Sequence, residues 1–176
     1  LSNYSRTVDQ LMKHADFALY YAKGQGKNKY QFFTEELYVI MSRKHMIDRA
    51  LRKAIDNSEF ELYYQPLVDI KSGKLVGLEA LLRWNAPFGT VAPDEFIPIA
   101  EETGWIVPIG EWVIEKVCKQ LKIWQEQDGS KVKVCVNISA RQFRDTSFMS
   151  TVSRIIEREQ IDPTFLEFEI TETVML

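Results

Sequence analysis

Polar side chains recur toward the ends of four segments that have the alternating pattern of β-strands. One segment places Glu79 and Arg83 on the face opposite its apolar residues, and the others contribute Gln65, Asn137 and Glu169. Carboxylate and amide oxygens are hard donors that suit Mg²⁺ or Mn²⁺, whereas zinc prefers nitrogen and sulfur. An arginine beside such donors indicates phosphate, because its planar guanidinium can bind two phosphate oxygens at once.

Each of these residues has a plainer interpretation when it is taken alone. A single glutamate on a strand more often faces solvent than binds a ligand, and an asparagine near a strand end is usually a turn former. The prediction therefore depends on a fold that brings the four strands together. In a (β/α) barrel, one register of each strand faces the helices and the other faces the lumen, and the site lies at the carboxyl-terminal mouth.

The pattern of elements agrees with such a fold. Residues 60–68 and 76–84 alternate and are separated by a hairpin-length connection, which predicts an antiparallel pair. Further elements are predicted as a helix from Pro93 to Gly104 with Asp94 as its cap, a helix over 109–125, a strand over 132–139, a helix over 148–159, and a strand containing Leu166, Phe168 and Ile170. Because helices of ten residues or more separate the later strands, a parallel α/β sheet is expected.

Two helical patterns precede the first strand. Apolar residues at helical spacing predict an amphipathic helix over 5–23, and Gly24 and Gly26 end it. Residues 29–33 have the pattern of a short strand, and a second helix is predicted over 34–55. We interpret this second helix as a connection that packs on the next domain; a signal-transmitting or dimerising helix is the alternative.

The composition predicts a soluble globular protein. The 176 residues are 45% hydrophobic and 27% charged, with a formal net charge of -3. This charge gives no electrostatic reason to expect binding to a nucleic-acid polymer. No run approaches the roughly 20 apolar residues of a membrane-spanning helix. Cys118 and Cys135 fit no metal-ligand spacing and are expected to be reduced thiols of a cytoplasmic protein.

The motifs on the main strands resemble those of EAL domains, which are cyclic-di-GMP phosphodiesterases built on a TIM-like barrel. The resemblance covers residues 57–176 and rests on several motifs that occur in order. These are Tyr64-Gln65-Pro66, Glu79-Ala80-Leu81-Leu82-Arg83-Trp84, Pro93-Asp94-Glu95-Phe96-Ile97-Pro98-Ile99-Ala100-Glu101, Asn137-Ile138-Ser139-Ala140-Arg141-Gln142 and Glu169-Ile170-Thr171-Glu172.

The resemblance implies a role for each candidate residue. Glu79, Asn137 and Glu169 are expected to be metal ligands, with Glu79 also the catalytic residue, and Gln65 and Arg83 are expected to contact the dinucleotide. Such enzymes use two divalent cations, here Mg²⁺ or Mn²⁺, to activate the water that opens one phosphodiester of the ring and gives linear pGpG.

The resemblance is incomplete at the end of the chain. Glu172 resembles the glutamate that steadies the loop after a later strand, but the family's paired aspartates, its lysine and its last glutamate would lie beyond Leu176. The sequence therefore predicts the N-terminal half of a barrel, truncated after about the fourth strand, and the lack of an initiator methionine suggests a piece of a longer protein. An open half-barrel exposes a sheet edge, so a homodimer is one expected state.

The first 33 residues resemble the C-terminal end of GGDEF domains, the diguanylate cyclase family. The resemblance rests on residues 15–23 followed by Gly26-Lys27-Asn28-Lys29-Tyr30. In that family, the basic residues matched by Lys23 and Lys27 face the triphosphate of GTP. The Gly-Gly-Asp-Glu-Phe loop is absent from the chain, so no cyclase activity is expected here. The two lysines are better explained as a basic helix end that complements the helix dipole.

These expectations define a domain order and a function. Residues 1–33 are the end of a GGDEF α/β domain, 34–56 a connecting helix, and 57–176 the first half of an EAL barrel. The whole protein is expected to hydrolyse cyclic-di-GMP in the bacterial cytoplasm, with or without an upstream membrane or sensory domain. The alternative is an inactive EAL domain that binds cyclic-di-GMP as a receptor; the enzyme is favoured because every family position within 57–176 is intact.

Overall fold

The computed structural model describes residues 7–24, 28, 30–129 and 131–170. The chain divides into two compact units, Leu1–Arg49 and Ala50–Leu176, so the boundary falls within helix α2 (Glu35–Ala54). No helix among the described residues is long and apolar enough to cross a membrane.

The first unit is built on helix α1 (Val8–Gly24) and the first turns of α2, and both helices agree with the sequence prediction. Its small core consists of Ala18 from α1 and Leu37 and Met41 from α2, with Phe17, Tyr21 and Phe33 packed around them. Lys23 is exposed at the end of α1, and Lys27 lies outside the described residues.

The predicted strand over 29–33 is wrong for residues 30–33, which are irregular, and Lys29 lies outside the described residues. A strand needs a neighbouring strand to satisfy its backbone hydrogen-bonding groups. The described part of this unit is helical apart from this segment, and it supplies no such neighbour. Phe33 instead stacks its ring on His14 at a centroid distance of 3.7 Å.

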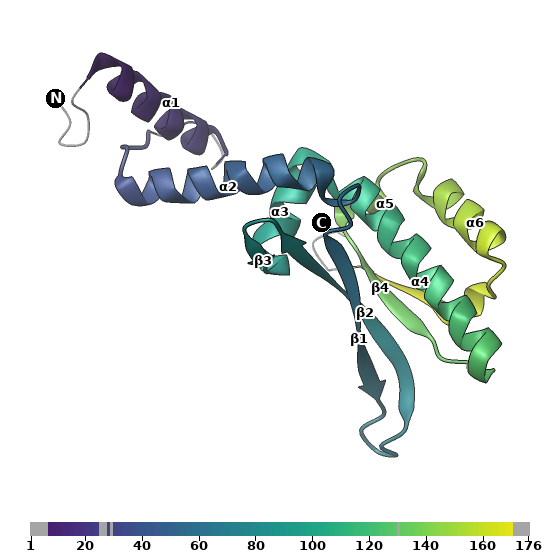
Figure 1. Ribbon diagram of the computed structural model, residues 1–176. Helices are drawn as coiled ribbons and strands as arrows, with labels where there is room; N and C mark the ends of the chain where they lie inside the picture. Colours follow the sequence, from purple (N-terminus) through teal and green to yellow (C-terminus); the bar gives the residue numbers. More distant parts are fainter. Residues whose placement is uncertain (1–6, 25–27, 29, 130, 171–176) are drawn as a thin grey trace. The chain divides into compact units, whose positions relative to one another are not determined.

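The second unit is organised around one sheet, in which the strand order is β1-β2-β4-β5 and β3 pairs with the outer end of β2 (Figure 1). The strands are β1 (Phe60–Val68), β2 (Leu75–Ala86), β3 (Gly89–Val91), β4 (Val134–Ile138) and β5 (Leu166–Ile170). β1 and β2 are antiparallel, whereas β2, β4 and β5 are parallel. The predicted hairpin and the predicted parallel strands are therefore confirmed.

The helices of this unit connect β3 to β4 and β4 to β5. They are α3 (Pro93–Thr103), α4 (Ile106–Asp128), α5 (Ala140–Phe143) and α6 (Phe148–Glu159), and a 3₁₀ turn, η1 (Pro163–Phe165), leads into β5. α4 packs on β4, α3 and α6. The prediction of Asp94 as the cap of α3 is wrong, because Ala92 occupies that position without a side-chain cap and Pro93 begins the helix.

One face of the sheet forms the hydrophobic core against these helices. Trp84 is fully buried, and its indole packs with Phe60 and Phe96 at centroid distances of 5.8 and 5.4 Å. Its Nε1 also donates a hydrogen bond to Glu59 Oε2 at 3.0 Å, which satisfies the one polar atom of the ring. On β4, alternate residues of this face are buried as well, ending with Ile138.

Cys118, on α4, is free and buried in this core, and the reduced state predicted for it is confirmed. Burial raises the pKa of its thiol to about 12, so the group stays protonated. Its side chain therefore acts as a small apolar core residue.

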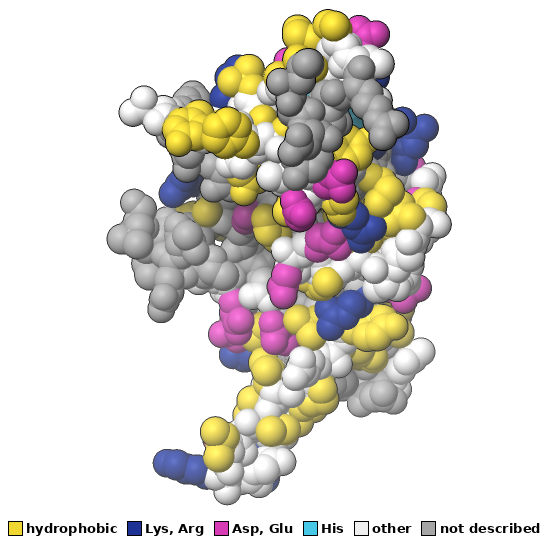
Figure 2. All heavy atoms as spheres, turned by 90° about the vertical axis from the view of Figure 1, so that its left-hand side faces the viewer, with side chains coloured by type: hydrophobic (Ala, Val, Ile, Leu, Met, Phe, Trp, Pro, Cys, Tyr) yellow, Lys and Arg dark blue, Asp and Glu magenta, His cyan; other side chains and the backbone are white. Residues whose placement is uncertain are grey.

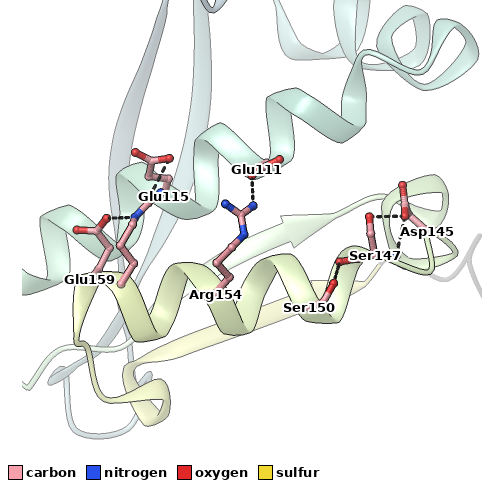
Figure 3. A network of polar contacts seen from close by, with 8 residues as sticks. Glu111, Glu115, Asp145, Ser147, Ser150, Arg154 and Glu159 are labelled. Carbon is pink, nitrogen blue, oxygen red and sulfur yellow. Dashed lines mark hydrogen bonds and ion pairs between the residues drawn. The ribbon is translucent and has the colours of Figure 1, made fainter.

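Ion pairs also join α4 to α6 at the surface of the helical layer (Figure 3). Arg154 on α6 points toward Glu111 on α4, with Nη2 2.7 Å from Oε1, and Arg158 binds Glu115 of α4 at 3.1 Å. All four side chains are partly exposed, and ion pairs between exposed side chains contribute little to stability. The burial of the Ile155 side chain on α6 is therefore the larger contribution to stability.

The short helix α5 begins with a reciprocal cap, and the capping residue Gln142 lies against α4. The Gln142 backbone N–H donates to Ser139 Oγ at 3.2 Å, and the Ser139 backbone N–H donates to Gln142 Oε1 at 3.1 Å. The Gln142 side chain is buried directly over Gly110 of α4, where an added Cβ would lie 1.7 Å from Gln142 Nε2. Glycine is therefore required at position 110 for the approach of α5.

We predict that Gly110→Ala destabilises the unit by about 1 kcal/mol or more, because the new methyl group displaces Gln142 from the cap. The expected change has the opposite sign to the usual one, because replacing glycine by alanine inside a helix normally stabilises it by about 1 kcal/mol. Urea unfolding of the chain measures the change.

The matched control is Gly110→Ala in a Gln142→Ala background, where the obstructing atom is gone. There the same substitution should be stabilising. A stabilising effect of Gly110→Ala in the unaltered chain would contradict the packing described here.

Candidate functional site

The strand register brings four of the predicted site residues to one face of the sheet. Gln65 on β1 is directly opposite Glu79 on β2, and Glu79 is in register with Cys135 on β4. Asn137 follows Cys135 by two residues and is in register with Glu169 on β5. Residues in register share a face, as do residues two apart on one strand. Gln65, Glu79, Asn137 and Glu169 therefore lie together on the face opposite the helices.

Two of these residues are in direct contact. The Asn137 side-chain Nδ2 donates a hydrogen bond to Glu79 Oε1 at 2.7 Å, although the two residues are 58 positions apart in the sequence. Glu79 is half-buried and Asn137 is exposed, so the contact lies at the surface of the sheet. Figure 2 shows Asp and Glu side chains gathered on the side of the molecule that is turned away from α4 and α6.

Cys135 is a member of this face that the sequence analysis treated only as a reduced thiol. It is free and 5% exposed. Burial raises the pKa of its thiol, and the negative charges of Glu167 and Glu169, a hydrogen bond with Glu169 and the charge of Glu79 raise it further. A thiol kept neutral adds no further negative charge between the carboxylates of Glu79 and Glu169. Its place in the polar register, two residues before Asn137, was the signal that could have identified it.

Arg83 lies on the same face, farther along β2. It follows Glu79 by four residues, which is roughly 13 Å in an extended strand. Its Nη1 donates a hydrogen bond to the backbone oxygen of Leu82 at 3.0 Å, and its Cζ lies 5.6 Å from the centre of the Tyr63 ring. The face thus presents carboxylates at one position and a half-buried guanidinium at another.

A cavity of about 320 Å³ opens at the carboxyl ends of β2 and β4. Its polar lining comes from Arg83, Glu101, Asn137, Ser139 and Gln142. Apolar side chains from α3, α4 and the two strands, among them Ile97 and Ile109, form the rest. The cavity is therefore at the end of the strands where a (β/α) barrel carries its site.

The donor set fits a hard divalent cation. Within the described ranges, no group of three or more His, Cys, Asp and Glu side chains is placed to hold a metal, so a cation here needs the Asn137 amide as well. The hydrogen bond to Glu79 keeps that amide beside a carboxylate, and Glu169 is opposite Asn137 on the next strand. Mg²⁺ is commonly bound through one or two carboxylates while it keeps several waters. Glu172 lies outside the described residues.

Comparisons with known proteins agree with this arrangement. The family model for the EAL domain matches residues 48–176. The bifunctional diguanylate cyclase/cyclic di-GMP phosphodiesterase MucR of Pseudomonas aeruginosa is 37% identical over 172 residues, which are 97% of this chain and 25% of MucR. The cyclic di-GMP phosphodiesterase PdeR of Escherichia coli is 35% identical over 167 residues, which are 94% of this chain and 25% of PdeR.

A solved structure is similar as well. The PaMucR phosphodiesterase in complex with c-di-GMP superimposes with a TM-score of 0.69 at 38% identity, covering 72% of this chain and 52% of that one. The chain thus spans about a quarter of the length of these curated relatives and about half of the solved domain. Because the family model covers most of the residues and the strand register groups the matching motifs on one face, the chain belongs to the EAL domain family.

Proposed function

We propose that the whole protein hydrolyses cyclic-di-GMP to linear pGpG with Mg²⁺ or Mn²⁺. In this proposal Glu79, Asn137 and Glu169 hold the cation, and Gln65 and Arg83 bind the dinucleotide. The observation that carries the proposal is the hydrogen bond from Asn137 to Glu79, which joins two hard donors across neighbouring strands. The relatives MucR and PdeR are both named as phosphodiesterases of this dinucleotide.

Glu79 and Asn137 act as a unit in this proposal. A divalent cation held at such a site supplies Lewis acidity and lowers the pKa of a bound water. The Asn137 N–H fixes one carboxylate oxygen of Glu79, so that the carboxylate has a defined orientation before any ligand arrives. Glu169 adds a second carboxylate from the strand beside Asn137.

Arg83 and Gln65 provide the recognition groups. The guanidinium of Arg83 can bind two phosphate oxygens with parallel hydrogen bonds. The side-chain amide of Gln65 offers both donors and an acceptor, and it lies directly opposite Glu79. The distance along β2 between Arg83 and Glu79, roughly 13 Å, leaves room for an extended ligand that reaches both.

The wider architecture is part of the same proposal. We place the described sheet in a (β/α) barrel whose lumen is the face of Glu79, with Glu172 steadying a loop. We assign residues 1–33 to the end of a GGDEF domain and 34–56 to a connecting helix in a cytoplasmic bacterial protein. Support comes from MucR, whose similarity extends over 97% of this chain and whose name includes a diguanylate cyclase.

We predict that Glu79→Ala in the whole protein lowers the rate of cyclic-di-GMP hydrolysis by at least about 10²-fold, because one of the proposed cation ligands is lost. Product formation is followed by chromatography with Mn²⁺ present and with a chelator. Glu157→Ala, which removes an exposed carboxylate on α6, is the matched control and should leave the rate unchanged. Full turnover by Glu79→Ala protein would refute the assignment, and binding without turnover by the unaltered protein would identify a receptor instead.

Arg83→Lys should weaken binding of cyclic-di-GMP by about tenfold, because a single ammonium cannot form two parallel hydrogen bonds to phosphate. Titration calorimetry with the cation chelated measures this affinity without hydrolysis. An unchanged affinity would show that Arg83 is a structural residue of the strand.

The 176 residues on their own are expected to form no pGpG, even with excess Mn²⁺. The proposed cation ligands Glu79, Asn137 and Glu169 offer two carboxylates and one amide, whereas a two-metal site needs further carboxylates for the second cation. The face is also open to water, which weakens the attraction between Glu169 and a cation. Chromatography decides the matter: pGpG above the metal-free background would contradict this expectation.

A further inference from the structure

Tyr63 and Arg83 form a contact on the site face that the proposed function does not use. The Arg83 Cζ lies 5.6 Å from the centre of the Tyr63 ring, within the range of a cation–π interaction. Tyr63 on β1 is directly opposite Leu81, so Arg83 is its diagonal neighbour across the antiparallel pair. The same face therefore carries an aromatic ring, a guanidinium and, two residues farther along β1, Gln65.

We propose that Tyr63 is a positioning residue that holds the Arg83 guanidinium in the orientation that receives a phosphate of the dinucleotide. The inference rests on the proposed function, because it assigns Arg83 a phosphate partner. It adds a residue that belongs to none of the metal or dinucleotide ligands named above.

The geometry favours positioning over plain packing. The Tyr63 side chain is 56% exposed, so its ring contributes little to the core. A cation–π contact does not use the guanidinium N–H donors, which lie in the plane of the group, so they remain available to a phosphate. The hydrogen bond from Nη1 to the Leu82 oxygen at 3.0 Å fixes one edge of that plane. Ring and carbonyl together restrict a long side chain that otherwise loses considerable rotamer entropy on binding.

Glu61 is the competing candidate for the same role. It is directly opposite Arg83 in the β1–β2 register and is exposed. A carboxylate would hold the guanidinium through its N–H edge, and that edge is the one a phosphate needs. The Tyr63 ring leaves the edge accessible, which is why we assign the positioning role to Tyr63.

The test is a double-mutant cycle in the whole protein. Tyr63→Val keeps a strand-forming residue and removes the ring, and it should weaken cyclic-di-GMP binding about two- to fivefold, raising KM more than it changes kcat. Tyr63→Phe keeps the ring and should change the affinity less than about twofold. In an Arg83→Ala background, Tyr63→Val should have no further effect.

A second readout needs no ligand. The ring current of Tyr63 should shift the NMR signal of the Arg83 Nε–H; the shift should persist in Tyr63→Phe and disappear in Tyr63→Val. An Arg83 signal that is insensitive to Tyr63→Val would overturn the proposal. So would a loss of affinity caused by Tyr63→Val that is equally large in the unaltered protein and in the Arg83→Ala background. A larger loss of cyclic-di-GMP affinity in Glu61→Gln than in Tyr63→Val would also overturn it.

The failure of this inference can be told apart from the failure of the proposed function. If the unaltered protein binds cyclic-di-GMP and Tyr63→Val binds it equally well, this inference alone fails. If the unaltered protein does not bind, the proposed function fails with it.

Discussion

Burial of one face of the sheet against α3 and α4 is the constraint on which the candidate site depends. Trp84 and Ile138 are buried on that face, and residues of a strand alternate between its two sides. Because those apolar side chains are buried against the helices, alternation places Glu79, Asn137 and Glu169 on the opposite face of the sheet. A shift of one strand by a single residue would move its polar side chain into the core, so the packing of the helices also sets the register of the site.

The close pairing of neighbouring strands then brings polar side chains of this face into contact with one another. Parallel pairing of β2 with β4 carries Asn137 beside Glu79, and the amide donates to the carboxylate at 2.7 Å. Gly77 permits the approach, since an added Cβ there would lie 3.2 Å from the backbone oxygen of Lys133. The neutral Cys135 thiol separates the carboxylates of neighbouring strands without adding charge. Like charges on one surface are most stable when a cation or a hydrogen-bond donor lies between them, and this face provides the donor.

The sequence predicted the parts of the structure that repeat and missed those that depend on tertiary contacts. Alternation identified the long strands and their faces because the period of two persists over many residues. β3 has three residues and exists through its pairing with β2, and α5 has four residues held by the Ser139 cap, so neither leaves a periodic signal. The irregular segment before Thr34 shows the reverse error, since a strand pattern without a neighbouring strand does not form a strand. The Tyr63–Arg83 contact could not be predicted, because it requires the exact register of β1 and β2.

The central claim is that Glu79, Asn137 and Glu169 together hold a divalent cation beside the dinucleotide. The most direct measurement is a crystal structure of the whole protein with cyclic-di-GMP and Mn²⁺, with the metal located by anomalous scattering. The account predicts a peak within about 2.5 Å of oxygen atoms from all three side chains, with a phosphate of the dinucleotide facing Arg83. A Mn²⁺ peak bound by other residues, or a dinucleotide bound on the helix side of the sheet, would contradict it.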